Sequence, residues 1–137
     1  MPELTPAENT ANVLAVFKRV LRPDGFIVIT CPDLQSFSAI VVANKLTDTA
    51  YTSPAGPISP LDILYGHRPS MAQGNLFMAH RCGFTQKVLG GSLHYAGFVR
   101  VAISRREHSC YDLWAVATLQ DHGDDELRAL ATAHFPG

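Results

Sequence analysis

The chain has 137 residues, of which 47% are apolar, and a formal net charge of −1. This length can enclose one hydrophobic core, so the composition excludes a disordered chain and predicts a single domain over residues 1–137. The balance of 11 basic and 12 acidic residues excludes a strong electrostatic attraction to nucleic acid or to an anionic membrane surface.

The cysteine content and the N-terminal sequence predict a cytoplasmic protein. Cys31, Cys82 and Cys110 are an odd number of thiols and cannot form a closed set of disulfides, which suits a reducing compartment. No apolar run approaches the roughly 20 residues that span a bilayer, and the first residues lack the pattern of a secretory signal. The histidines are not spaced as in a zinc site, so we expect no metal.

The first third of the chain predicts a helix, a strand and a second helix. Thr5 is the expected N-cap of the first helix, which ends at the turn 23–25. Residues 26–31 are a continuous apolar run, typical of a strand that is covered on both faces. Asp33 is the expected cap of the second helix, whose apolar stripe runs to about residue 45.

Residues 47–84 are rich in proline and glycine and predict an irregular excursion from the domain. We expect regular structure there only as a short turn of helix over 61–65. An excursion of this length is more than a connector needs, and such segments are often binding loops.

A third helix should follow the excursion. Thr85 is its expected cap, and Gly97 should end it in the left-handed conformation. Gly90 and Gly91 inside this helix each cost about 1 kcal/mol relative to alanine, which predicts close packing against another backbone.

The C-terminal segment predicts two strands and a helix. Residues 98–105 alternate in polarity, residues 111–119 are more uniformly apolar, and the short turn between them predicts an antiparallel pair. Asp124 is the expected cap of a last helix.

Two stretches of this pattern are similar to the class I S-adenosylmethionine-dependent methyltransferases. Residues 18–25, Lys-Arg-Val-Leu-Arg-Pro-Asp-Gly, lead into strand 26–31 as an "RVLRPGG" turn leads into the fifth strand of that family. Gly83-Phe84-Thr85 and Ala96-Gly97-Phe98 resemble the borders of its next helix, before the sixth strand. The resemblance implies an α/β fold, a partial Rossmann-like sheet with strands equivalent to 5, 7 and 6, an antiparallel last strand, and flanking helices.

The resemblance covers only the C-terminal half of such an enzyme. The family binds S-adenosylmethionine with a first strand, a glycine loop and an acidic residue about 20 residues later, and this sequence has none of them. Whether the chain alone is an enzyme stays open, since its cofactor site would be incomplete. Strand 26–31 would also keep an unpaired apolar edge, so we expect a homo-oligomer or a partner chain that covers it.

The resemblance places the pocket for a small-molecule acceptor beside the excursion. The candidate substrate-binding residues are Tyr65, His67, Arg68, His80 and Arg81. A histidine there could act as a general base, and an arginine could pair with a carboxylate or phosphate. The alternative is that these side chains cap helices and bond to loop carbonyls.

Thr5 matches the position where the family's cofactor-proximal loop enters the helix, although capping already explains this residue. The sequence therefore predicts the C-terminal portion of a methyltransferase, inactive as this chain alone, that acts on a small molecule. The alternative is a non-catalytic binding, regulatory or oligomerisation module derived from such an enzyme.

Overall fold

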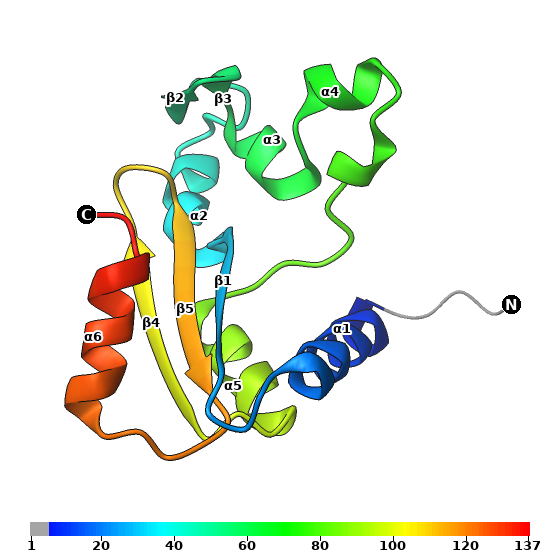
Figure 1. The fold of residues 1–137 in the computed structure, drawn as a ribbon. Helices are drawn as coiled ribbons and strands as arrows, with labels where there is room; N and C mark the ends of the chain where they lie inside the picture. The colour runs from blue at the N-terminus through cyan, green and yellow to red at the C-terminus, as the bar shows by residue number, and fades with distance from the viewer. Residues whose placement is uncertain (1–5) are drawn as a thin grey trace, which may run out of the picture.

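The structure, a computed structural model, describes residues 6–137 and shows a mixed α/β fold (Figure 1). Its elements in chain order are α1 (Pro6–Val20), β1 (Phe26–Pro32), α2 (Leu34–Val42), β2 (Tyr51–Ser53), β3 (Gly56–Ile58), α3 (Pro60–Tyr65), α4 (Arg68–Ala72), the 3₁₀ helix η1 (Leu76–Met78), α5 (Gln86–Tyr95), β4 (Arg100–Arg106), β5 (Asp112–Thr118) and α6 (Asp124–His134).

The main sheet has the strand order β1-β5-β4. β5 runs antiparallel to both neighbours, so β1 and β4 are parallel to each other. Val116 in the middle of β5 lies between Val28 of β1 and Ala102 of β4. The order expected from the sequence and its antiparallel last strand are thus confirmed.

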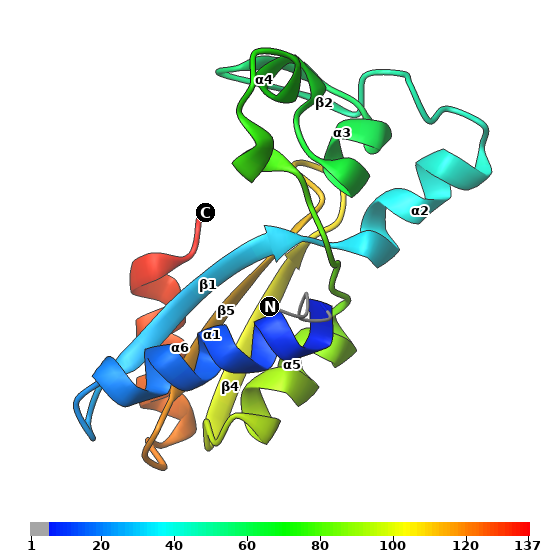
Figure 2. The same cartoon turned by 90° about the vertical axis from the view of Figure 1, so that its right-hand side faces the viewer.

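Helices cover both faces of this sheet, but unequally. α1 and α5 lie on one face, and α6 lies on the other (Figures 1 and 2). α6 packs against β4 and β5. The helix therefore leaves most of the outer face of β1 open.

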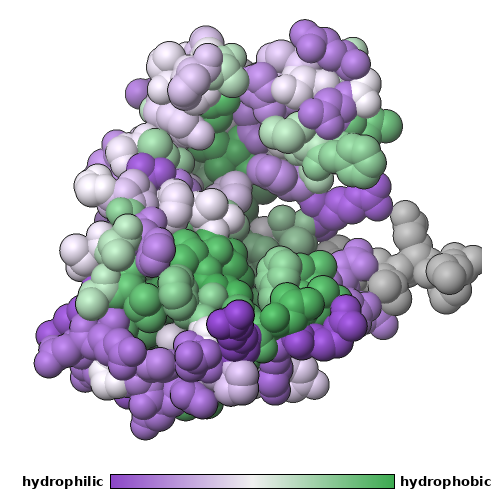
Figure 3. Space-filling model, viewed as in Figure 1, coloured by the Kyte–Doolittle hydropathy of each residue, from purple (hydrophilic) through white to green (hydrophobic). Residues whose placement is uncertain are grey.

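β1 is consequently not buried on both faces, and that expectation is wrong. Ile27, Ile29 and Cys31 pack against the core beneath α1 and α5. Val28 and Thr30 point the other way and are exposed. Hydrophobic surface gathers where β1 and α1 lie (Figure 3). A continuous apolar run thus does not require two covered faces in this chain.

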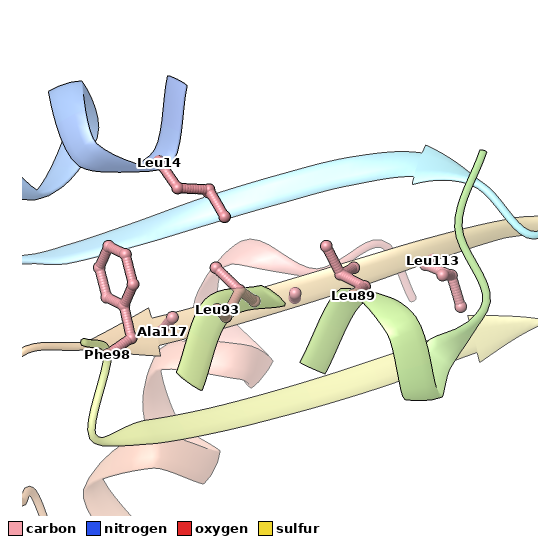
Figure 4. Close-up of a cluster of buried hydrophobic side chains, with 7 residues drawn as sticks. Leu14, Leu89, Leu93, Phe98, Leu113 and Ala117 are labelled. Atoms are coloured by element: carbon pink, nitrogen blue, oxygen red, sulfur yellow. The ribbon is translucent and has the colours of Figure 1, made fainter. Parts of the chain in front are cut away.

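The main core lies between the sheet and the α1/α5 layer (Figure 4). Its buried members are Leu14 of α1, Leu89 and Leu93 of α5, Phe98, and Leu113, Ala115 and Ala117 of β5. Leu93 and Leu113 are completely buried. The apolar stripes expected for these helices face the sheet only in part, because Val13 and Val20 of α1 and Val88 of α5 are 49%, 68% and 50% exposed.

The excursion has more regular structure than its sequence suggests. It contains the β2–β3 hairpin, α3, α4 and η1, and its own small core joins Phe37 of α2 to Ile58 and Ile63. Together with α2, the excursion forms a lobe over residues 34–84. The two ends of this lobe meet, since the Leu34 amide donates to the Phe84 carbonyl over 3.0 Å. The lobe over residues 34–84 thus leaves and rejoins the sheet domain at one place (Figure 1).

Two local expectations are corrected. Gly90 meets only the tip of the Ile103 side chain, at 3.5 Å from a hypothetical Cβ, and a Cβ on Gly91 would meet open space, so no backbone packs closely there. α6 is capped by Gly123, and Asp124 instead lies in the first turn, where it pairs with Arg100. The left-handed end of α5 at Gly97, with φ of 102°, is confirmed.

Candidate functional site

A cavity of about 410 Å³ lies at the carboxyl end of β1, between the sheet and the excursion lobe. The sheet contributes Thr30, Cys31, Pro32 and Asp112, the turn between β4 and β5 contributes Cys110, and the lobe contributes Tyr51, Ser53, Ala55, Ile58, Asp62, Ile63, His67, Ser70, Met78 and His80. Ligands of α/β proteins bind at the carboxyl ends of parallel strands, so this is the place where such a fold positions a site.

Two of the predicted histidines, His67 and His80, line this cavity. His80 Nδ1 lies 2.9 Å from the carbonyl oxygen of Ile63. Because a carbonyl oxygen only accepts hydrogen bonds, Nδ1 carries the proton, and Nε2 of the neutral ring is an acceptor. His67 Nδ1 lies 2.7 Å from Ser70 Oγ. Both rings are thus oriented by a bond through Nδ1.

The buried carboxylate of Asp62 is fully engaged with its neighbours. Oδ1 accepts from the backbone N and Nε of Arg68, at 3.1 and 2.9 Å, and Oδ2 accepts from the backbone N and Oγ of Ser59, at 3.0 and 2.8 Å. Burial alone would raise the pKa of Asp62, but these hydrogen bonds outweigh it and hold the pKa far below its ordinary value. Asp62 is therefore a permanently charged structural anchor.

Asp112 is neutralised in a similar way. Arg106 donates to it through two nitrogens, at 2.7 and 2.5 Å, and Trp114 Nε1 donates over 3.1 Å. The hydrogen bond to Asp112 raises the pKa of Arg106. Burial raises the pKa of Tyr51, whose hydroxyl therefore stays protonated. The cavity has two carboxylates in its wall, yet each already has an arginine partner.

The Cys31 thiol in the wall of the cavity is a poor nucleophile in this arrangement. Burial, with a contribution from nearby Asp33 and Asp112, raises the pKa of Cys31 to about 12. A thiol with this pKa is protonated at neutral pH. Cys31 thus forms part of the wall rather than a reactive group.

The other predicted residues do not enter the cavity. Arg68 donates through Nε to the Asp62 carboxylate over 2.9 Å, which is neither a helix cap nor a bond to a loop carbonyl. Tyr65 is 59% exposed and borders, with His80 and Arg81, a separate depression of about 220 Å³. Thr5 lies outside the described residues. Of the predicted residues, His67 and His80 therefore line the cavity, whereas Arg68 and Arg81 do not.

Several residues of the site have no counterpart among the sequence-based candidates. The spacing Ser59-x-x-Asp62 is a capping-box signal and could have been read from the sequence. Tyr51 and Asp112 carry no such signal, because only the register that places Asp112 opposite Pro32 brings them to the end of β1.

A larger groove of about 760 Å³ runs between α1 and α5. Its wall is apolar apart from a few groups, chiefly Thr10, Ser92, Cys82 and Tyr95. Specific ligand sites combine an apolar wall with converging polar groups, and the oriented histidines meet that description better. We therefore take the smaller cavity as the candidate site.

No family model, curated protein or solved structure matches the chain. Within residues 6–137, no group of three or more histidine, cysteine, aspartate or glutamate side chains is placed to hold a metal ion. In the same part of the chain, no helix combines the length and apolarity needed to cross a bilayer.

Proposed function

We propose that this chain is the acceptor-binding portion of an S-adenosylmethionine-dependent methyltransferase. One observation carries the proposal: a cavity with two oriented histidines lies at the carboxyl end of β1, in a sheet whose antiparallel β5 separates parallel β1 and β4. The sequence similarity around residues 18–25 supports the same assignment.

The described residues do not fit the cofactor itself. The strand end at Pro32-Asp33 leads directly into α2 and contains no glycine, so the backbone cannot approach a nucleotide there as a glycine loop allows. Under the proposal, the cofactor-binding strands come from outside residues 6–137. We assign to this chain acceptor binding and proton removal only.

His80 is the group best placed for proton removal. Its Nδ1 is held by Ile63, so Nε2 is available to accept a proton from a bound acceptor. Tyr51 and His67 border the same space and would orient the acceptor. Methyl transfer depends mainly on such positioning, because an in-line displacement needs little further catalytic machinery.

The proposal is tested by S-adenosylhomocysteine binding and by the coding sequence upstream of Met1. We expect a strand, a glycine loop and an acidic residue about 20 residues later, upstream or in a neighbouring frame. Calorimetry should then give a micromolar dissociation constant for the complete assembly and no heat for this chain alone. Binding by the chain alone would contradict the incomplete site. If no cofactor-binding half is encoded nearby and S-adenosylhomocysteine does not bind, a non-catalytic association module is favoured.

The alternative is an association module without catalysis, and the free edge of β1 favours it. Within residues 6–137, β1 pairs with β5 and with no other strand, and its residues 26–32 include no charged side chain to discourage a further strand. Val13, Val16 and Val20 of α1 are 49%, 47% and 68% exposed and share one helical face. Neither this edge nor this helix face carries a charged side chain, and we take the two as the candidate association surface.

We propose a second copy of the chain as the occupant of this surface when the chain is alone. Two-fold antiparallel pairing of β1 with itself would set apolar side chains opposite each other and oppose no charges. Size-exclusion chromatography with light scattering should show twice the mass of the chain. A clean monomer across the accessible concentration range would contradict self-association.

A further inference from the structure

The candidate cavity has no unsatisfied charge to offer a ligand. Each oxygen of Asp62 already accepts two hydrogen bonds, and Asp112 is held by Arg106 and Trp114. Among the described residues, no lysine or arginine lines the cavity. An anionic ligand would therefore meet two carboxylates and no cation, and a cationic ligand would compete with arginines already in place.

Among the uncharged polar groups of the wall, the His80 ring offers an oriented hydrogen-bond acceptor. His80 uses Nδ1–H on the Ile63 carbonyl, which leaves the Nε2 lone pair for a donor on the ligand. A neutral hydroxyl group is such a donor. The cavity thus favours a ligand that donates a hydrogen bond over a ligand that carries a charge.

The rest of the wall is suited to a ring. Ile58 and Ile63 supply aliphatic surface from the lobe, Tyr51 supplies an aromatic side chain, and Met78 supplies a polarisable thioether, which contacts aromatic rings favourably. A cavity of about 410 Å³ is in the range that holds small organic molecules.

We propose that this cavity binds an uncharged, ring-sized molecule through a hydroxyl group that donates to His80 Nε2. That this ligand is the methyl acceptor rests on the proposed function. The binding of the ligand does not depend on the proposed function. Phenol represents the class, and anisole is the same ring without the donor. Benzoate is the same ring with a negative charge.

The test is a titration of the ¹⁵N-labelled chain with each probe, followed by NMR. Phenol should shift the amides of Tyr51, His67 and His80, and should bind about fivefold more tightly than anisole, as expected for one neutral hydrogen bond. Benzoate should bind more weakly than both. These measurements need no cofactor, so they can succeed even if methyl transfer is never found.

The variant His80→Asn isolates the acceptor. The asparagine amide nitrogen can replace Nδ1 as donor to Ile63, while Nε2 is lost, so the fold is retained and phenol and anisole should bind equally. His108→Asn, at a side chain 95% exposed, is the matched control and should keep the fivefold preference. Equal binding of phenol and anisole to the unmodified chain, tighter binding of benzoate, or no shift at the cavity amides would overturn the proposal.

Discussion

Gly66 fixes the distance between α3 and the segment that carries His80, and replacing it should disturb the candidate site. Its φ of 108° and ψ of 160° lie in a region that is essentially restricted to glycine. A Cβ at this position would press on the Met78 carbonyl, 2.8 Å from its carbon atom. His80 follows Met78 by two residues, and its amide donates to the Tyr65 carbonyl, next to Gly66, over 3.0 Å.

The expected cost of Gly66→Ala has two parts. Forcing alanine into this backbone conformation costs about 1–3 kcal/mol, and the collision with a backbone carbonyl adds to it because the carbonyl cannot rotate away. We expect a total loss of about 3 kcal/mol. Gly74→Ala is the matched control, since Gly74 also has a positive φ, of 93°, but its Cβ would meet open space. There we expect a loss of about 1 kcal/mol.

Native-state hydrogen exchange at the His80 amide measures the difference directly. A loss of about 3 kcal/mol accelerates exchange about 100-fold when the lobe opens reversibly, and a loss of about 1 kcal/mol accelerates it about fivefold. Urea unfolding followed by circular dichroism supplies the global stability of both variants. Equal exchange rates in Gly66→Ala and Gly74→Ala would refute the argument, because only the close approach to Met78 distinguishes the two sites.

Three further predictions concern other parts of the molecule. Val16→Asp should weaken self-association about 100-fold in sedimentation experiments, because an unpaired charge would be buried, whereas Val42→Asp, at a residue 85% exposed on α2, should not. The depressed pKa of Asp62 stabilises the fold above about pH 4, the ordinary value of aspartate, and this contribution is lost as the pH falls towards the folded-state pKa. A plot of Tm against pH should therefore fall less steeply for Asp62→Asn in acid; equal slopes would contradict this. Iodoacetamide at pH 8 should modify exposed Cys82 long before Cys31, as peptide mass spectrometry can show, and equal rates would argue against the burial of Cys31.

The elements of the sheet domain could be predicted because their signals are local. The apolar run at 26–31 and the alternation at 98–105 specify strands, and the capping residues Asp33 and Thr85 specify where helices begin. Each of these signals concerns neighbouring residues. The order of the strands came from the resemblance to a known family rather than from the pattern itself.

The lobe and its cavity could not be predicted in the same way. Its strands have three residues each, too few for a periodic pattern, and its many prolines and glycines conceal the β2–β3 hairpin and α4. The open face of β1 has no local signal either, because the sequence does not show that α6 packs mainly against β4 and β5.

Long-range polar contacts were the least accessible to sequence reasoning. Asp33 was identified as a helix cap, and it does accept from the Gln35 amide over 3.1 Å. It also accepts from Arg105, 72 residues further along, at 2.8 Å. Burial alone would raise the pKa of Asp33, but the bonds from Ser36, Arg105 and Gln35 lower it below its ordinary value. Only the sheet register reveals that this carboxylate joins α2 to β4.

The hydrogen bond between Leu34 and Phe84 closes the base of the lobe. Its ends are already closed by a backbone hydrogen bond, and its hydrophobic cluster around Phe37 is distinct from the one beneath α1 and α5. Lengthening a closed loop costs little, about 0.6 kcal/mol for each doubling. Insertions in the loops of the lobe should therefore cost the sheet little, provided that Ser36, which bonds to Asp33 and Arg105, and Phe84, which packs against the main core, are kept. Changes in these loops can therefore alter which ligand the cavity binds, while the sheet that supports the lobe keeps its fold.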